Sequence, residues 1–262
     1  MDAPTRPGAP GAAAHAVLLH GFTGSGAAWG DAVVEGLAAA GHVPVLVDLP
    51  GHGRRAGERD PACFTLEAAL RDVAAAGRWP ADLVGYSMGA RLALHFAAAH
   101  PERVRRLVLE SGSPGLATEE ERRERRARDA ELARFALEHG MDAFLERWEA
   151  QPLFESRACI DPRARARQRE LKLRNAPASL AAALEGLGTG ALPSLWDRLG
   201  EIRAPTLLLV GALDCKYVAI ARRMAAALPD ARVVEVPDAG HTVHLERPGA
   251  WVAAVVDFLR EP

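Results

Sequence analysis

The feature that most constrains the fold is a regular alternation of short apolar runs with longer helical patterns. Apolar runs that we expect to be strands cover 15–21, 43–48, 81–86, 104–110, 206–210 and 232–236. Helical patterns cover 28–40, 65–76, 88–99, 218–227 and 248–259. Strands that are apolar on both faces and alternate with helices are typical of a parallel sheet between helical layers. We therefore predict an α/β fold with a mostly parallel sheet and helices on both faces.

The alternation is interrupted once, over residues 115–200, where the sequence is helical and contains no strand-like run. Because the alternation then resumes, the simplest organisation is one α/β core, 1–114 and 201–262, with a helical cap inserted at 115–200. An insertion that follows the C-terminal end of a strand lies beside the edge where open α/β sheets bind ligands. We therefore expect the functional site to lie between the core and the cap.

The segment Gly85-Tyr86-Ser87-Met88-Gly89 has the pattern G-x-S-x-G and falls between a predicted strand and a predicted helix. The two glycines allow a sharp turn, in which the serine hydroxyl is lifted out of the sheet at the start of the helix. The bare pattern is common by chance, but its place between a strand and a helix favours a reactive Ser87 over an ordinary loop serine.

A reactive serine needs an imidazole, and the imidazole needs an acid that fixes its tautomer. Asp214 follows the strand expected at 206–210, and His241 follows the one expected at 232–236. Both residues therefore belong at the same sheet edge as Ser87, and the order Ser, Asp, His is a known triad order. His244 is the competing imidazole, although we expect it to face along the following helix.

Two backbone N–H groups would be needed to hold a developing oxyanion. One should come from Met88, directly after the serine, and the other from the loop 20–24, most plausibly from Phe22. His20-Gly21 is also explained by a tight turn alone. His52, in the segment 48–53, resembles a structural turn and is not expected to be catalytic.

The chain has 30 arginines, two lysines and a net charge of −2. A near-neutral balance argues against a nucleic-acid coat and a polybasic membrane anchor. Arg91 lies four residues after Ser87, one helical turn away, so it shares a face with the serine and indicates an anionic ligand. An internal salt bridge is the alternative explanation. The insertion holds 14 arginines, of which most, as in 119–131, should lie on a solvated helix face.

Three cysteines without C-x-x-C spacing support neither a disulfide framework nor a zinc site. No apolar run approaches the roughly 18 residues of a membrane helix. The first 14 residues lack the pattern of a signal peptide. We therefore expect a cytoplasmic protein that acts on a small molecule without a metal or organic cofactor. The sequence leaves its oligomeric state open.

These motifs resemble those of the α/β-hydrolase superfamily, through the segments 20–22, 48–53, 85–89 and 240–241. More narrowly, the chain is similar to the 2-succinyl-6-hydroxy-2,4-cyclohexadiene-1-carboxylate (SHCHC) synthase family of menaquinone biosynthesis. The narrower resemblance rests on the segments 86–91, 110–116, 121–125 with Asp129, 148–154, 173–175 and 214–217. It therefore runs through the insertion and covers most of 15–260.

The resemblance implies a lyase that eliminates pyruvate from an enolpyruvyl cyclohexene carboxylate with a succinyl chain. By position, Ser87 would be the base, His241 its activator and Asp214 the orienting acid, with oxyanion donors at Phe22 and Met88. The substrate carries three carboxylates, which suit arginine pairing. The substrate-binding residues would be His20, Tyr86, Arg91, Arg125, Trp148, Arg174 and Lys216. The arginine-rich run leaves Arg122 or Arg128 as alternatives to Arg125, and no role follows for Ser113.

Two other classes of function remain open at this point. A hydrolase of the same fold, either a carboxylesterase or a carbon–carbon bond hydrolase, would use the same serine, histidine and acid. The arginines disfavour neutral esters but do not exclude acidic diketones. A non-catalytic binding protein is the third class, and the complete set of Ser87, Asp214 and His241 argues against it.

Overall fold

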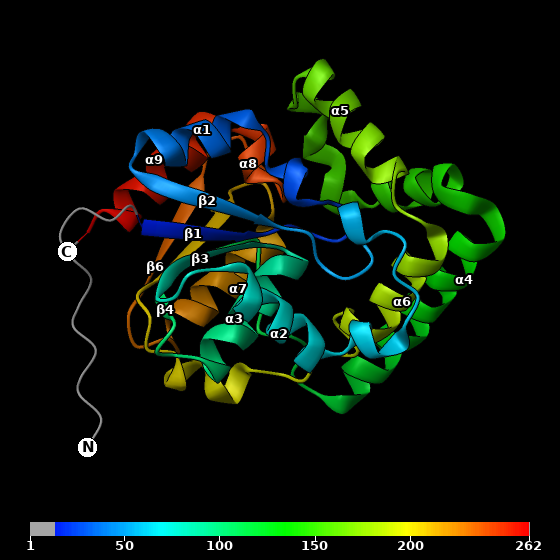
Figure 1. Ribbon diagram of the computed structural model, residues 1–262, viewed down its shortest axis with the longest axis horizontal. Helices are drawn as coiled ribbons and strands as arrows, with labels where there is room; N and C mark the ends of the chain where they lie inside the picture. Colours follow the sequence, from blue (N-terminus) through cyan, green and yellow to red (C-terminus); the bar gives the residue numbers. More distant parts are fainter. Residues whose placement is uncertain (1–13, 262) are drawn as a thin grey trace.

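A computed structural model describes residues 14–261 and contains one six-stranded sheet (Figure 1). The start of the chain, where no signal peptide is expected, lies almost wholly outside the described residues. The strand order is β2-β1-β3-β4-β5-β6, and every neighbouring pair is parallel. This confirms the parallel sheet. The strands are β1 (Ala14–Leu19), β2 (His42–Val47), β3 (Ala81–Tyr86), β4 (Val104–Glu110), β5 (Thr206–Gly211) and β6 (Ala231–Val236).

Helices cover both faces of the sheet because successive side chains of a strand point in opposite directions. In β1, Val17 and Leu19 join one core cluster, while Ala16 and Leu18 join the other. The first cluster is closed by α2 (Leu66–Ala76), α3 (Met88–Ala99) and α7 (Cys215–Ala225). The second is closed by α1 (Asp31–Ala39), α8 (Val243–Glu246) and α9 (Pro248–Leu259). Figure 1 shows the two helical layers on opposite sides of the strands.

Several helix ends follow from local capping. The side chain of Thr65 accepts a hydrogen bond from the Ala68 N–H and starts α2, as expected. Helix α7 begins at Cys215, three residues before the predicted start, because the Asp214 carboxylate accepts the Tyr217 N–H. The helix expected from residue 28 is divided at Gly30, whose φ of 79° separates a short 3-10 turn, η1 (Gly26–Trp29), from α1.

Between β4 and β5 the described chain is helical and contains no strand, as predicted. This segment consists of α4 (Glu119–Glu149), η4 (Pro152–Cys159), α5 (Pro162–Leu173), α6 (Pro177–Leu187) and η5 (Trp196–Glu201). Helices α4 and α6 pack against each other. Figure 1 shows α4, α5 and α6 to one side of the sheet. Two further 3-10 turns, η2 (Gly53–Arg55) and η3 (Pro61–Phe64), lie between β2 and α2.

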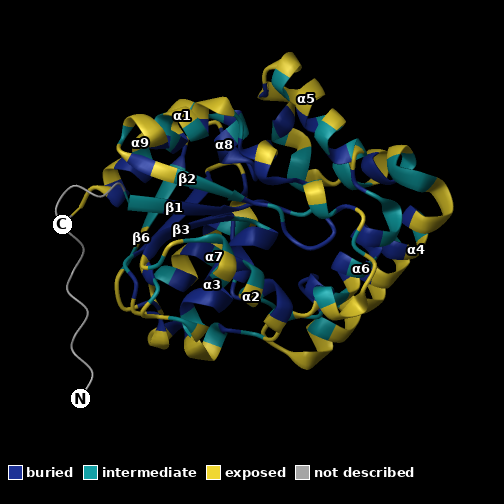
Figure 2. Cartoon of the chain, viewed as in Figure 1, coloured by how far each residue is buried: buried dark blue, intermediate teal, exposed yellow. Residues whose placement is uncertain are grey.

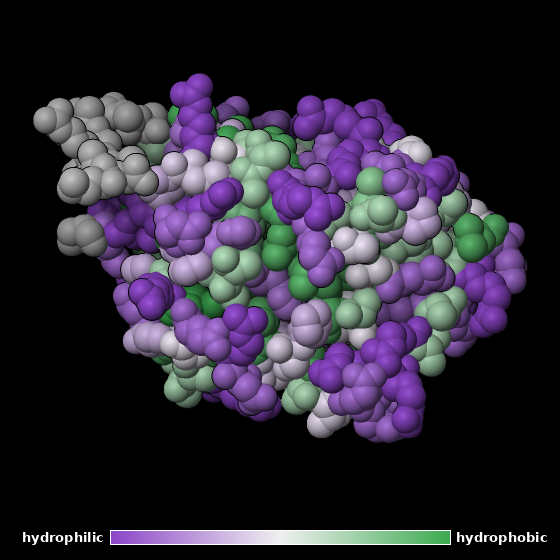
Figure 3. Space-filling model, turned by 60° about the horizontal axis from the view of Figure 1, so that its bottom comes forward, coloured by the Kyte–Doolittle hydropathy of each residue, from purple (hydrophilic) through white to green (hydrophobic). Residues whose placement is uncertain are grey.

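Helix α4 has an exposed, charged outer face (Figure 2). Its arginines pair with acids one turn away, as in Arg123–Glu120 and Arg128–Glu124. These pairs are the i,i+3 and i,i+4 contacts expected of a solvated face. Hydrophilic residues dominate the molecular face in Figure 3, with apolar residues in small groups between them. No helix within residues 14–261 is both long enough and apolar enough to cross a membrane.

Candidate active site

Ser87 occupies a strained turn between β3 and α3. Its φ of 50° lies in the left-handed region that favours glycine, and it is the N-cap residue of α3. A Cβ on Gly85 would lie 2.5 Å from the Gly89 carbonyl oxygen, and a Cβ on Gly89 would overlap the backbone of Leu19. Both motif glycines are therefore required for the close packing of α3 against β1 and β3, which carries the Ser87 hydroxyl to the sheet edge.

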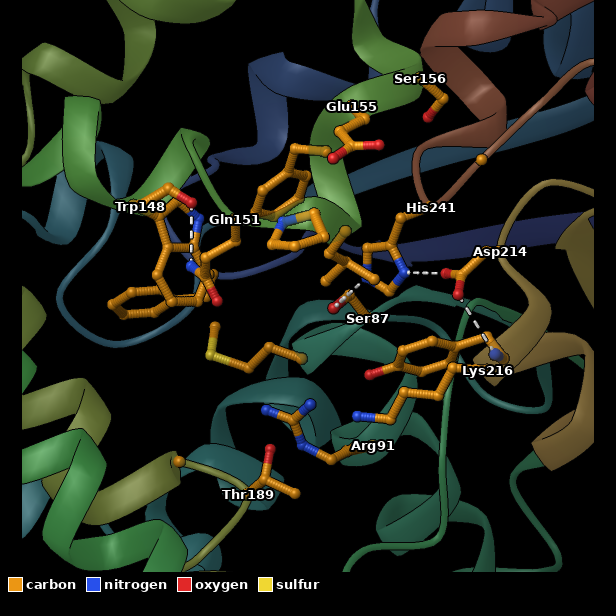
Figure 4. A pocket seen from close by; sticks show the side chains of 18 of the residues that line it. Ser87, Arg91, Trp148, Gln151, Glu155, Ser156, Thr189, Asp214, Lys216 and His241 are labelled. Atoms are coloured by element: carbon orange, nitrogen blue, oxygen red, sulfur yellow. Dashed lines mark hydrogen bonds and ion pairs between the residues drawn. The ribbon is translucent and has the colours of Figure 1, made fainter.

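Ser87, His241 and Asp214 form a continuous hydrogen-bonded chain (Figure 4). The Nε2 atom of His241 lies 3.0 Å from the Ser87 Oγ, and its Nδ1 lies 2.7 Å from the Asp214 Oδ2. His241 is 1% exposed and Asp214 8% exposed, so water competes little for these bonds. The geometry suits transfer of a proton from the serine hydroxyl to the imidazole, with the carboxylate fixing the tautomer.

His244, the competing imidazole, is bonded to a different acid, Glu110. Its Nδ1 lies 2.9 and 3.0 Å from the two carboxylate oxygens of Glu110, and its backbone N–H donates to the same carboxylate. Glu110 also accepts the indole N–H of Trp251 at 2.8 Å. The structure thus joins Ser87 to His241 and places His244 in a separate buried pair.

The two predicted oxyanion donors are available to a ligand. Met88 is the first residue of α3, where backbone N–H groups have no intrahelical acceptor. The Phe22 N–H has no acceptor in the hydrogen bonds found within residues 14–261. The next residue is fixed, because the Thr23 N–H donates to His52 at 3.2 Å and its carbonyl accepts from the Asn175 side chain at 2.7 Å. Asn175 therefore ties the helical segment to the loop that carries Phe22.

His20 lies at a small cavity beside Ser87, and both of its ring nitrogens are bonded to the backbone. Its Nδ1 donates to the Gly21 carbonyl at 2.8 Å, and its Nε2 accepts the Leu49 N–H at 3.1 Å. Burial lowers the pKa of His20 to about 4, so the ring is neutral at neutral pH. Because backbone groups use both nitrogens, His20 shapes the loop. Burial likewise lowers the pKa of His52 to about 3.

A cavity of about 790 Å³ opens above Ser87, between the core and the helical segment. Phe22 and Trp148 meet edge to face at its wall, with ring centroids 5.0 Å apart. Nine residues of the predicted site line it: Phe22, Ser87, Met88, Arg91, Arg125, Trp148, Asp214, Lys216 and His241. Sequence reasoning assigned no role to the further lining residues Gln151, Phe154, Glu155, Thr189 and Tyr217.

Arg91 brings a buried positive charge to this cavity. It is 8% exposed, its Nε has no hydrogen-bond partner, and within residues 14–261 it forms no ion pair. Burial lowers the pKa of its guanidinium to about 10, which leaves it protonated at neutral pH. The internal salt bridge that the sequence left open is therefore absent from the described structure. Figure 4 shows Arg91 and Lys216 on the same side of the cavity, with Thr189 beside Arg91.

Arg125 is the arginine of its run that reaches the cavity. Its Nε donates to the Asp129 Oδ1 at 2.8 Å, which orients the guanidinium. Of the two alternatives, Arg122 bonds to Glu119 and to a backbone carbonyl, and Arg128 bonds to Glu124. Neither lines the cavity, so the structure favours Arg125.

Arg174 lies away from the site. It is exposed at the C-terminal end of α5 and lines neither cavity near Ser87. The cations of this region that lie close to the site are Lys172 and Arg157, which are buried and both bonded to Glu149. They line a second cavity of about 50 Å³ on the other side of Phe22 and Trp148. Tyr86 also lines it, with its hydroxyl 3.0 Å from the Thr242 Oγ1.

One missed residue had a readable signal. Tyr217 is three residues after Asp214, within the first turn of a helix that starts at the site, and its ring lies 4.6 Å from that of His241. Gln151 and Thr189 had no such signal, because their places depend on how distant helices pack. Within residues 14–261 no group of His, Cys, Asp or Glu is arranged to hold a metal, and the three cysteines are free.

Comparison with known proteins identifies relatives along nearly the whole chain. The model of the alpha/beta hydrolase family matches residues 16–255. A Bacillus subtilis (strain 168) protein that carries the name SHCHC synthase is 41% identical over 95% of this chain and 92% of its own length. The SHCHC synthase of Pectobacterium atrosepticum is 35% identical over 94% of each chain.

Solved structures give the same picture of the fold. The structure of MenH from S. aureus superposes with a TM-score of 0.86 at 31% identity, over 94% of this chain and 93% of that one. A thermophilic esterase from Thermogutta terrifontis, solved with malate bound, has a TM-score of 0.77 at 27% identity, over 94% and 89% of the two chains.

Proposed function

The chain belongs to the alpha/beta hydrolase family and, within it, to the SHCHC synthases, and from this premise we propose that it is a pyruvate-eliminating lyase. Its substrate would be 2-succinyl-5-enolpyruvyl-6-hydroxy-3-cyclohexene-1-carboxylate, and its products SHCHC and pyruvate, in menaquinone biosynthesis. One observation carries the proposal: the hydrogen-bonded residues Ser87, His241 and Asp214 line a cavity that Arg91 and Lys216 also line. Within residues 14–261 neither of these two cations forms an ion pair.

In this reaction Ser87 acts as a base. His241 takes the hydroxyl proton as the serine oxygen removes a proton from a ring carbon, and Asp214 stabilises the imidazolium. The electron pair of the broken C–H bond forms a double bond to the next ring carbon, the existing ring double bond moves one carbon along, and the C–O bond to the enolpyruvyl group breaks, so that the leaving group departs as the enolate of pyruvate. The proton removed from the ring is passed to the methylene carbon of the leaving group, which becomes pyruvate, and His241 returns its proton to Ser87. No water and no outside proton are consumed.

The remaining residues bind and orient the substrate. The N–H groups of Phe22 and Met88 hold the negative charge that develops on the carbonyl oxygen next to the deprotonated carbon. Arg91, Arg125 and Lys216 pair with carboxylates, and Trp148 and Phe22 pack on the ring. Tyr86, Lys172 and Arg157 shape the adjoining small cavity. We further propose that residues 115–200 act as the cap of this site and that the enzyme works on its free substrate in the cytoplasm.

A hydrolase is the second candidate, because the esterase from Thermogutta terrifontis shares the fold and the same serine chemistry would cleave esters. Arg91 argues against it for neutral esters, since an ester without a charge would leave this buried guanidinium unpaired.

The decisive experiment measures pyruvate release from the enolpyruvyl substrate, coupled to lactate dehydrogenase, beside a panel of p-nitrophenyl esters. We expect rapid pyruvate release and weak esterase activity. In Ser87→Ala the release should fall by about three to four orders of magnitude with unchanged folding, as for the loss of other triad residues. Fast ester cleavage without pyruvate would establish the hydrolase instead, and near-normal turnover in Ser87→Ala would remove the serine from the mechanism.

A further inference from the structure

Glu246 is a buried carboxylate that touches the backbone on both sides of His241. It lies at the end of α8 and is 4% exposed. Its Oε2 accepts the Gly240 N–H at 2.6 Å, and its Oε1 accepts the Thr242 N–H at 3.0 Å. No lysine or arginine within residues 14–261 forms an ion pair with it. The side chain therefore closes a small ring around the residue that carries the imidazole.

These two hydrogen bonds hold the backbone on both sides of His241 and so orient its side chain. The loop after β6 contains no regular structure, and Asp238, at a φ of 54°, turns it sharply. Without Glu246, two buried N–H groups beside His241 would lack an acceptor, which is costly in a protein interior. A carboxylate satisfies both groups at once, so the peptide planes before and after His241 are fixed together.

The segment η4 covers this carboxylate. The Cys159 Sγ lies 3.9 Å from the Glu246 Oε2, and a Cβ on Gly240 would overlap the Ser156 side chain. The Phe154 ring stands edge-on to His241, with centroids 6.0 Å apart. Figure 4 shows Glu155 and Ser156 on this segment beside His241. The Glu246 side chain is thus buried, and a buried charge acts more strongly on its neighbours than one in water.

We propose that Glu246 is a positioning residue for His241, which holds the imidazole between Ser87 and Asp214 and makes it a stronger base by its negative charge. The role rests on the proposed function only in that His241 must act as a base. Proton transfer from Ser87 turns His241 into an imidazolium, and a second carboxylate besides Asp214 stabilises that cation. The ionisable groups near the pair are Asp214, Tyr217 and Tyr86 around His241, Cys159 beside Glu246, and His244 on the same helix, while Arg157 and Glu110 act on Tyr86.

Two substitutions separate geometry from charge. Glu246→Gln keeps the shape, but its amide can accept only one of the two N–H groups and carries no charge. Glu246→Asp keeps the charge, but its shorter chain cannot reach both amides equally well. In Glu246→Gln we expect the His241 NMR titration to move to lower pH than in the wild type and the turnover number to fall about tenfold to a hundredfold, with little change in KM. In Glu246→Asp the titration should stay near its wild-type position while turnover falls.

The titration is measured on the full-length protein without substrate, from the low-field proton NMR signal of the His241 Nδ1–H as pH is varied. Asp82→Asn is the matched control. Asp82 is also buried, but it lies at the end of β3 away from the site, where it bonds to Arg105 of β4. This variant should lose stability without moving the His241 titration.

The outcomes separate this inference from the proposed function. An unchanged His241 titration in Glu246→Gln, with a loss of stability like that of Asp82→Asn, would make Glu246 merely structural. If Glu246→Gln does not fold, an unchanged turnover in Glu246→Asp would overturn the positioning role. Wild-type protein that releases no pyruvate would refute the lyase assignment, while the NMR titration would still decide the role of Glu246.

Discussion

Arg91 is deeply buried and forms no ion pair within residues 14–261, although the charge of Asp129 acts on it from a distance, and this makes its role testable. In Arg91→Met the apolar stem remains and the buried charge disappears. We expect the free energy of unfolding to stay the same or rise, because a buried charge without a partner destabilises the free protein. The kcat/KM for the three-carboxylate substrate should fall about 100-fold, because a substrate carboxylate loses its charged hydrogen bonds. Urea denaturation and pyruvate release measure the two effects.

Arg128→Met is the control for this substitution. Arg128 is exposed, pairs with Glu124 and does not line the cavity above Ser87, so neither quantity should change much. A large loss of stability in Arg91→Met with normal specific activity would instead show that Arg91 holds the fold together.

The residues that sequence analysis placed well are those whose positions depend on local order. Ser87, Asp214 and His241 each follow a strand of the same parallel sheet, so their common edge could be predicted without side-chain detail. Arg174 could not be placed, because it and the buried Lys172 are two residues apart on one helix, and only the docking of α5 decides which faces inward. The backbone bond of His20 could not be predicted either, because its partner, Leu49, is 29 residues away.

At the scale of elements, Gly140 divides α4 into two parts. Its φ of 77° and ψ of −177° are essentially restricted to glycine, and nothing lies within 4 Å of the place of a Cβ. Gly140→Ala should therefore cost about 1–3 kcal/mol through the backbone alone. Because Arg125 and Trp148 lie on opposite sides of this bend, we also expect weaker substrate binding. Thermal unfolding and the KM for pyruvate release measure the two effects.

Gly249→Ala is the matched control for this prediction. Gly249 lies in the first turn of α9, also has open space around it, and has an ordinary φ. Alanine there should be neutral or stabilising by up to about 1 kcal/mol. Equal effects of the two substitutions would show that the bend at Gly140 does not depend on glycine.

The helical character of 115–200 could be predicted because no strand pattern occurs there. The bend in α4 could not, since a glycine within a helical pattern can equally end a helix or be tolerated inside it. The early start of α7 was missed for a related reason. The cap comes from Asp214, a residue that the sequence analysis assigned to the site and not to the helix.

For the whole molecule, the net charge of −2 conceals an uneven distribution. Acids and arginines cancel on the outer face of α4, whereas Arg91 and Lys216 reach the cavity without ion pairs in the described structure. A nearly neutral chain can thus present a positive site to an anionic substrate. The position of Arg91 could be predicted from its spacing to Ser87. The charge around the cavity could not, because it depends on which acidic side chains the fold places away from the cavity.

Three buried histidines predict how the stability of the whole fold responds to acid. Burial lowers the pKa of His20 and His95 to about 4 and that of His52 to about 3, whereas the ordinary value is 6.5. Between pH 6.5 and pH 4 these histidines become protonated in the unfolded chain but stay largely neutral in the folded protein. Stability is therefore complete above about pH 6.5 and is lost as pH falls toward 4, with a slope of up to about 1.4 kcal/mol per pH unit for each histidine.

His95→Leu tests this linkage, because His95 has no hydrogen-bond partner in the described structure. Its ring is buried on α3, one helical turn from Arg91. We expect the variant to lose less stability between pH 7 and pH 5 than the wild type, in urea denaturation at each pH. Asp129, whose pKa burial raises, acts in the opposite sense, but it is common to both proteins and cancels in their difference. His139→Gln, which removes an exposed imidazole of α4, is the control variant for this substitution. Parallel curves for His95→Leu and the wild type would show that the proton uptake on unfolding comes from other groups.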